Sequence, residues 1–138
     1  MANTKITGVQ GEKIAADYLR SRGYRILERN YFLRASHGPK IAEVDIIAKK
    51  RDVFAFVEVK TIKANSRFLA QDKVNETKKW KIAKAAEMWL IKNKIQLDAK
   101  WQIDVIAIEL LPDNRSTLIK KLLGPKFTLS HFENVSGG

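Results

Sequence analysis

The sequence of 138 residues contains no cysteine, only two histidines and only three prolines. The absence of cysteine excludes disulfides, thiolate metal sites and a cysteine nucleophile. No run of 18 apolar residues is present, which argues against a membrane-spanning helix. The first residues lack the apolar segment of a secretory signal. We therefore expect a cytoplasmic protein with no membrane partner.

Two common catalytic motifs are also missing. There is no Gly-rich phosphate loop of the Walker type and no nucleophile-elbow serine. The two histidines, His37 and His131, are far apart in the sequence and do not have metal-ligand spacing. We expect His37 in a loop and His131 on the surface, so neither histidine suggests a site.

Apolar and basic side chains are plentiful. The hydrophobic fraction of 45% predicts one folded domain over residues 1–138 with a substantial core. The net charge is +11, and residues 60–100 hold 11 Lys and Arg against four Asp and Glu. A local basic surface favours polyanions such as nucleic acids, although lysine-rich helices can also simply keep a protein soluble.

The apolar pattern predicts a helix, three strands, a helix and two strands. This order indicates an α/β fold, a mixed five-stranded sheet flanked by helices. The short polar connection at residues 49–52 implies an antiparallel hairpin. The expected helices cover about residues 9–22 and 75–94. The expected strands cover residues 24–32, 41–48, 53–60, 101–111 and 117–122, and a short packing segment with Phe127, Leu129 and Phe132 follows.

The candidate site is a set of charges inside the two apolar strands of this hairpin. Asp45 lies in one strand, and Glu58 and Lys60 lie in the next. Buried carboxylates are costly unless a cation or a donor compensates them. If Ala48 faces Val53, strand alternation places Asp45, Glu58 and Lys60 on one face. Asp45 and Glu58 are then diagonal neighbours with Cα atoms about 7–8 Å apart, a spacing that one divalent cation could bridge.

Two carboxylates and a lysine are groups that metal-dependent phosphodiester hydrolysis uses. Mg²⁺ or Mn²⁺ held by Asp45 and Glu58 would act as a Lewis acid and lower the pKa of bound water. The Val59 carbonyl could add a third oxygen ligand, and Lys60 could orient the water or stabilise charge on the phosphate. The alternative is an internal ion pair, but two acids and one base leave a net negative site, which favours a metal.

Two helical residues are further candidates. Glu12 falls on the apolar stripe of the first expected helix. It either suits the helix dipole in the first turn or holds a second cation or a metal-bound water. Lys78 lies at the centre of the apolar stripe of the second helix, where snorkelling is the alternative to a direct role. Asp104, near the start of the fourth strand, is expected in a salt bridge or a turn.

These residues resemble the PD-(D/E)XK nuclease superfamily, with Asp45 and the triplet 58–60 as its motif. More closely, the chain resembles the YraN family of small bacterial proteins over about residues 8–134. The matching segments include GVQGEKIA at 8–15, EVDIIA at 43–48, FVEVKT at 56–61, IDV at 103–105 and HFEN at 131–134. The chain departs from the family pattern at Ala42, at Ile62 and in a longer loop over residues 33–40.

The resemblance implies the restriction-endonuclease-like fold and a place for Glu12 in the site. Holliday-junction resolvases share a similar N-terminal helix and motif arrangement, so the resemblance also implies branched or junction DNA as a substrate.

Three hypotheses follow. The first is a Mg²⁺-dependent endonuclease acting on DNA, for which a homodimer would suit the cutting of two strands. The second is a catalytically inactive nucleic-acid-binding module of the same fold. The third is a protein-interaction partner that docks through an exposed Trp or the basic helix. In the first, the catalytic residues are Glu12, Asp45, Glu58, Lys60 and Lys78, and the metal ligands are Asp45, Glu58, Val59 and Glu12.

Overall fold

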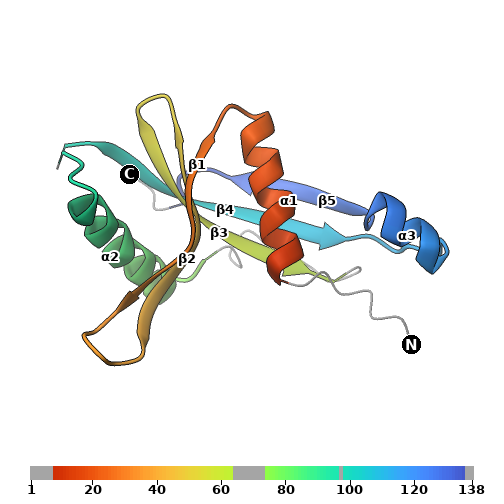
Figure 1. Cartoon of the computed structure of the whole chain (residues 1–138), viewed down its shortest axis with the longest axis horizontal. Coiled ribbons are helices and arrows are strands. Elements are labelled where there is room, and N and C mark those ends of the chain that lie inside the picture. The colour runs from red at the N-terminus through yellow and green to blue at the C-terminus, as the bar shows by residue number, and fades with distance from the viewer. Residues whose placement is uncertain (1–7, 64–73, 97, 136–138) are drawn as a thin grey trace.

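The computed structural model describes residues 8–63, 74–96 and 98–135 (Figure 1). The strands form one sheet in the order β1-β2-β3-β4-β5. The β3–β4 pair is parallel and the other pairs are antiparallel, which confirms the predicted mixed five-stranded α/β fold. The elements are α1 (Gly8–Ser21), β1 (Arg25–Arg34), β2 (Lys40–Lys50), β3 (Val53–Ile62), α2 (Glu76–Lys92), β4 (Lys100–Leu110), α3 (Thr117–Leu123) and β5 (Phe127–Phe132).

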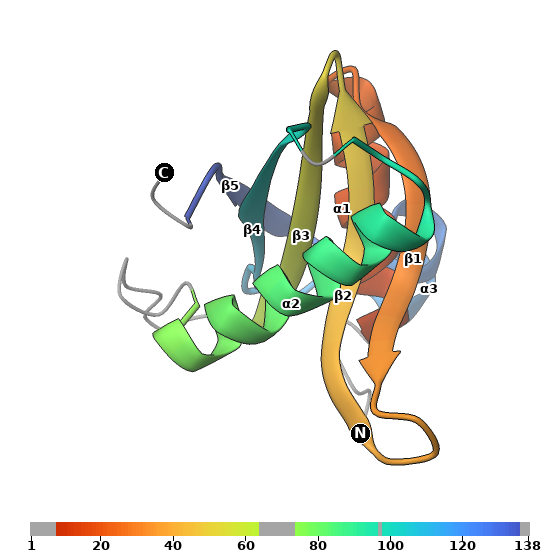
Figure 2. The ribbon, with the colours of Figure 1, turned by 90° about the vertical axis from the view of Figure 1, so that its left-hand side faces the viewer.

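Helices α1 and α2 cover opposite faces of the sheet (Figures 1 and 2). On the α2 face, Phe56 of β3 packs in a buried cluster with Trp89 of α2. On the α1 face, Val57 of β3 packs in a second cluster with Leu19 of α1. Strand β3 is therefore buried on both sides, which explains why its sequence is apolar nearly throughout. No helix in the described ranges is long and apolar enough to cross a membrane.

The prediction of a strand over residues 117–122 is wrong, because this segment forms helix α3. Its apolar residues recur at 118, 119, 122 and 123, which is the period of a helix. The Ser116 side chain caps the helix by accepting a hydrogen bond from the Ile119 N–H at 3.2 Å. The fifth strand is instead Phe127–Phe132, the segment expected only to pack, and it pairs antiparallel with β4.

The β2–β3 hairpin is tighter than predicted. Ala48 faces Ala55, and Lys50 faces Val53 across a turn formed by residues 51 and 52. The expected pairing of Ala48 with Val53 is therefore wrong by two residues. A shift of two positions leaves the alternation unchanged, so this difference alone moves no residue to the other face. The observed pairing ends at Ile46 and Val57.

Candidate active site

The strands β2 and β3 stop pairing immediately before the two candidate acids. Their last paired residues are Ile46 and Val57, and the next residues are Asp45 and Glu58. The Asp45 Oδ2 accepts a hydrogen bond from the Val59 N–H at 2.7 Å. The carboxylate thus takes the place of a main-chain acceptor, and beyond this point the strands are free to diverge.

Strand β2 also changes face at Asp45. Val44 packs in the cluster on the α2 face, whereas Ile46, two residues later, packs in the cluster on the α1 face. At the same level of β1, Asn30 has a φ of 54°, a left-handed conformation that Asn tolerates better than most residues. Asp45 therefore sits at a bend of the sheet, between its two faces.

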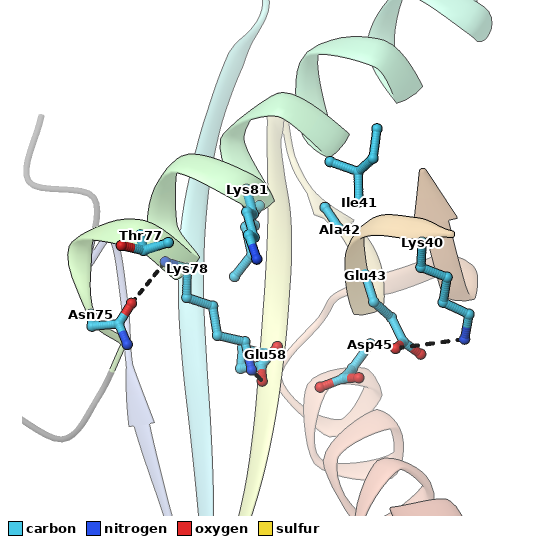
Figure 3. Close-up of a pocket in the computed structure, with 11 residues that line it drawn as sticks. Lys40, Ile41, Ala42, Glu43, Asp45, Glu58, Asn75, Thr77, Lys78 and Lys81 are labelled. Carbon is cyan, nitrogen blue, oxygen red and sulfur yellow. Dashed lines mark hydrogen bonds and ion pairs between the residues drawn. The ribbon is translucent and has the colours of Figure 1, made fainter. Parts of the chain in front are cut away.

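A pocket of about 480 Å³ opens where the strands part, between β2, β3 and the start of α2. Figure 3 shows Asp45 and Glu58 side by side in it, with Lys78 reaching down from α2 to Glu58. The lining residues are Lys40, Ile41, Ala42, Glu43, Asp45, Glu58, Asn75, Thr77, Lys78, Lys81 and Ile82.

Lys78 forms an ion pair with Glu58, with 2.5 Å between Nζ and Oε1. Glu58 is buried, so this cation compensates a charge that has little access to water. The start of α2 is fixed by Asn75, whose Oδ1 accepts from the Lys78 N–H at 2.8 Å. The Lys78 side chain is about half exposed at 47%, so its ion pair with Glu58 is compatible with both snorkelling and a direct role.

Asp45 is not neutralised in the same way. Burial raises the pKa of Asp45 to about 7, repulsion from Glu58, Glu12 and Glu43 acts in the same direction, and the Val59 N–H opposes it. Lys78 alone therefore does not compensate both Asp45 and Glu58. Carboxylate oxygens are ligands that Mg²⁺ and Mn²⁺ prefer, so these two acids could contribute to a metal site.

The other two predicted residues, Glu12 and Lys60, are not among the described residues that line the pocket. Glu12 of α1 contacts Arg29 at 4.0 Å, and its charge raises the pKa of Asp45, so α1 brings it near the site. Lys60 lies opposite Ala107 of β4.

A second polar group was missed from the sequence. His131, expected on the surface, has a side chain only 8% exposed, and its Nε2 lies 2.9 Å from Asp104 Oδ2. Asp104 also accepts from Gln102 Nε2 and from the Asn134 N–H, each at 2.9 Å. Asp104, expected in a salt bridge or a turn, contacts His131, and this contact is a salt bridge only when the imidazole is protonated. The contact between His131 and Asp104 depends on the pairing of β5 with β4, and the sequence pattern does not predict β5 as a strand.

Asp104, His131 and Glu133 each place a ligand atom within 4.8 Å of the others, so this group could hold a metal ion. Its members already have protein partners: His131 Nδ1 is 3.1 Å from the Tyr18 hydroxyl, and the Tyr24 hydroxyl donates to Glu133 at 3.3 Å. Burial, with the nearby acids, raises the pKa of Tyr24 to about 12, so this donor keeps its proton. The hydrogen bonds of this group connect α1, β4 and β5. In the Asp45 pocket, by contrast, the Asp45 carboxylate has a main-chain N–H as its hydrogen-bond donor.

Residues 11–108 match the family model described as "Uncharacterised protein family UPF0102". A UPF0102 protein of Clostridium botulinum strain 657 is 38% identical over 116 residues, which is 84% of this chain and 89% of the relative. A UPF0102 protein of Trichlorobacter lovleyi is 42% identical over 112 residues, 80% of this chain and 83% of the relative. One of Chlorobium phaeobacteroides is 41% identical over 101 residues, 73% of this chain and 74% of the relative.

Proposed function

The chain belongs to the UPF0102 family, also called YraN, and we propose that it is a metal-dependent endonuclease that hydrolyses phosphodiester bonds in DNA. The family match confirms the resemblance to YraN. The proposal goes further and assigns a PD-(D/E)XK nuclease site to this chain. The observation that carries the proposal is the pair of a buried Glu58 and a half-buried Asp45 where β2 and β3 part.

The residues of the pocket suit the requirements of this reaction. Asp45 and Glu58, with the Val59 carbonyl, would hold Mg²⁺ or Mn²⁺, which supplies Lewis acidity and a bound water of lowered pKa. The Val59 N–H keeps the Asp45 carboxylate oriented. Lys78, once released from Glu58, can stabilise negative charge on the phosphate. Lys60 would orient the attacking water, and Glu12 would bind a second cation or a metal-bound water.

DNA is proposed as the substrate because the rim of the pocket is basic. Lys40, Lys78 and Lys81 line it, in a chain of net charge +11. Lysines around an acidic centre attract phosphates while the metal compensates the acids. Part of the basic segment, residues 64–73, lies outside the described residues.

The test is cleavage of branched, single-stranded and duplex DNA with Mg²⁺ or Mn²⁺. Asp45→Asn and Glu58→Gln should each lower the rate by at least about 100-fold, as expected for the loss of a group needed in the transition state. Asp52→Asn is the matched control, because Asp52 is an exposed acid in the turn of the same hairpin, paired with Lys100. Cleavage that survives in both site variants would indicate a contaminating nuclease and refute the proposal.

The second candidate is a nucleic-acid-binding module that does not cut. The observation that favours it is the Lys78–Glu58 ion pair, because a lysine already compensates one of the two acids. Calorimetric titration with Mn²⁺ separates the two functions. Saturable binding that is lost in Glu58→Gln supports the nuclease. The absence of Mn²⁺ binding, together with salt-sensitive DNA binding, supports the module.

A further inference from the structure

The hairpin formed by β1 and β2 lies next to the pocket and extends beyond the helices (Figure 2). Its tip is residues 35–39, between the ends of the two strands, and the Gly38 N–H donates to the Ala35 carbonyl there. Lys40 and Ile41, just after the tip, line the pocket. The hairpin is therefore one wall of the candidate site and continues past it.

An aromatic ring with two cations lies at the base of this tip. Phe32 is 39% exposed. The Arg34 guanidinium carbon lies 4.9 Å from its ring centroid, and the Lys40 Nζ lies 4.5 Å from the same centroid. We call Phe32, Arg34 and Lys40 the Phe32 clamp. Attraction of each cation to the ring holds both near one exposed aromatic surface.

The two positive charges of the Phe32 clamp are poorly compensated. Glu43 is 4.0 Å from Lys40, and both side chains are nearly half exposed, so this pair is worth little in water. Two like charges gathered on one ring repel each other, and an anion between or beside them would relieve that repulsion. A nucleic-acid backbone supplies such anions at regular spacing.

We propose that the Phe32 clamp binds an unpaired nucleic-acid strand beside the pocket, with Arg34 and Lys40 moving from the ring to the flanking phosphates as a base stacks on the ring. Base faces are covered in a duplex but accessible in a single strand, so an exposed aromatic ring selects unpaired segments. This inference rests on the proposed function, which places the DNA to be cut in the pocket. It adds that the substrate has a single-stranded segment next to the cut.

Binding can be measured without cleavage by adding EDTA. We expect Phe32→Leu to weaken binding of a short fluorescent single strand about tenfold, as loss of one stacked base predicts. Binding of the matching duplex should change less than about twofold. The control is Trp80→Leu, because Trp80 is also exposed, at 59%, and has Lys84 over its ring at 5.6 Å, but lies on α2 and does not line the pocket.

The two cations are tested through salt dependence. Arg34→Gln and Lys40→Gln should each reduce the slope of log K against log salt for the single strand by roughly 0.7, the value for one phosphate contact. Phe32→Tyr, which retains an aromatic ring, should restore single-strand affinity if Phe32→Leu has lost it. Thermal unfolding of each variant shows that the fold is intact.

Three results would overturn the clamp: an unchanged affinity in Phe32→Leu, an equal loss for duplex and single strand, or the same loss in Trp80→Leu. These results differ from a failure of the nuclease. No cleavage by the wild type, with binding that still depends on Phe32, refutes only the proposed function. Cleavage by a Phe32→Leu variant of unchanged affinity refutes only the clamp.

Discussion

At the residue scale, the two acids of the pocket are compensated in different ways. Glu58 has Lys78 as a partner at 2.5 Å, whereas Asp45 has a main-chain N–H and three repelling carboxylates. The positions of Asp45 and Glu58 could be predicted, because acids in apolar strands and the parity of a hairpin are readable in the sequence. The absence of Lys60 from the described residues that line the pocket could not be predicted. It depends on how β2 and β3 diverge after their pairing ends at Ile46 and Val57.

The first prediction concerns Asp45 and pH. Its folded-state pKa, about 7, is above the ordinary 3.8, so the protonated form is favoured in the folded protein. The resulting stability is present below pH 3.8 and is lost as the pH rises through 7. Without metal, Asp45→Asn should therefore be more stable than the wild type at pH 8, by about 2 kcal/mol after allowance for partial exposure, and should lose this advantage at pH 4.

Urea unfolding in EDTA at both pH values measures this difference. Asp52→Asn serves as the control, since its carboxyl pKa is lowered, chiefly by a hydrogen bond from Lys100, and its pH dependence should have the opposite sign. Parallel pH profiles for the wild type and Asp45→Asn would contradict the assignment of a raised pKa to Asp45.

The second prediction concerns Lys78. Its ammonium contacts the Glu58 carboxylate, which is also a proposed metal ligand, so the two cations would compete. Lys78→Met should bind Mn²⁺ more tightly, on the order of fivefold, the equivalent of about 1 kcal/mol. Without metal it should unfold at a lower temperature, because Glu58 loses its partner.

Calorimetric titration and thermal unfolding test both parts. Lys79→Met is the matched variant, because Lys79 is the next residue of α2 and pairs with the exposed Glu76 instead. If Lys78→Met binds Mn²⁺ no better than Lys79→Met does, Lys78 does not compete for the site.

At the element scale, the molecule is held together by contacts between segments far apart in the chain. The type of α1, β1 to β3, α2 and β4 could be predicted from apolar periodicity. Helix α3 occupies the segment predicted as a strand over residues 117–122, although the apolar repeat at 118, 119, 122 and 123 is helical and could have indicated it. Strand β5 is short, and its pairing with β4 is a long-range contact that local patterns do not reveal.

The third prediction concerns the attachment of β5. Asp104 is fully buried, and His131 supplies one of its hydrogen bonds. His131→Ala should lower the free energy of unfolding by about 1–3 kcal/mol, because a buried acceptor loses a partner. It should also speed hydrogen exchange in β5 more than in β2.

Chemical denaturation and hydrogen exchange provide the measurements. The exposed pair Asp52–Lys100 is the comparison, and Lys100→Ala should change stability far less than His131→Ala. Equal effects of the two substitutions would mean that the Asp104 group contributes no more than a surface contact.

At the scale of the whole molecule, both buried clusters lie on one sheet and share its central strand. Phe56 faces the α2 cluster, and its neighbours Ala55 and Val57 face the α1 cluster. Neither half of the core can be lost without exposing β3 to water. We therefore propose that residues 1–138 form one cooperative unit.

The fourth prediction is that this unit unfolds in one step. Urea unfolding followed by tryptophan fluorescence, which includes Trp89 in the α2 cluster, should coincide with unfolding followed by circular dichroism. Val57→Ala, on the other face, should shift both curves together by about 1–3 kcal/mol, twice the range for removal of one buried methyl group. Separate transitions for the two signals would contradict a single domain.

The parallel pairing of β3 with β4 also bears on synthesis of the chain. Strand β3 finds its second neighbour only after α2 has been made, since β4 follows that helix. A nascent chain that ends before β4 presents an apolar strand with an unpaired edge, a form prone to aggregation. Fragments that stop in or before α2 should precipitate on release, even though both acids of the pocket are already present in them.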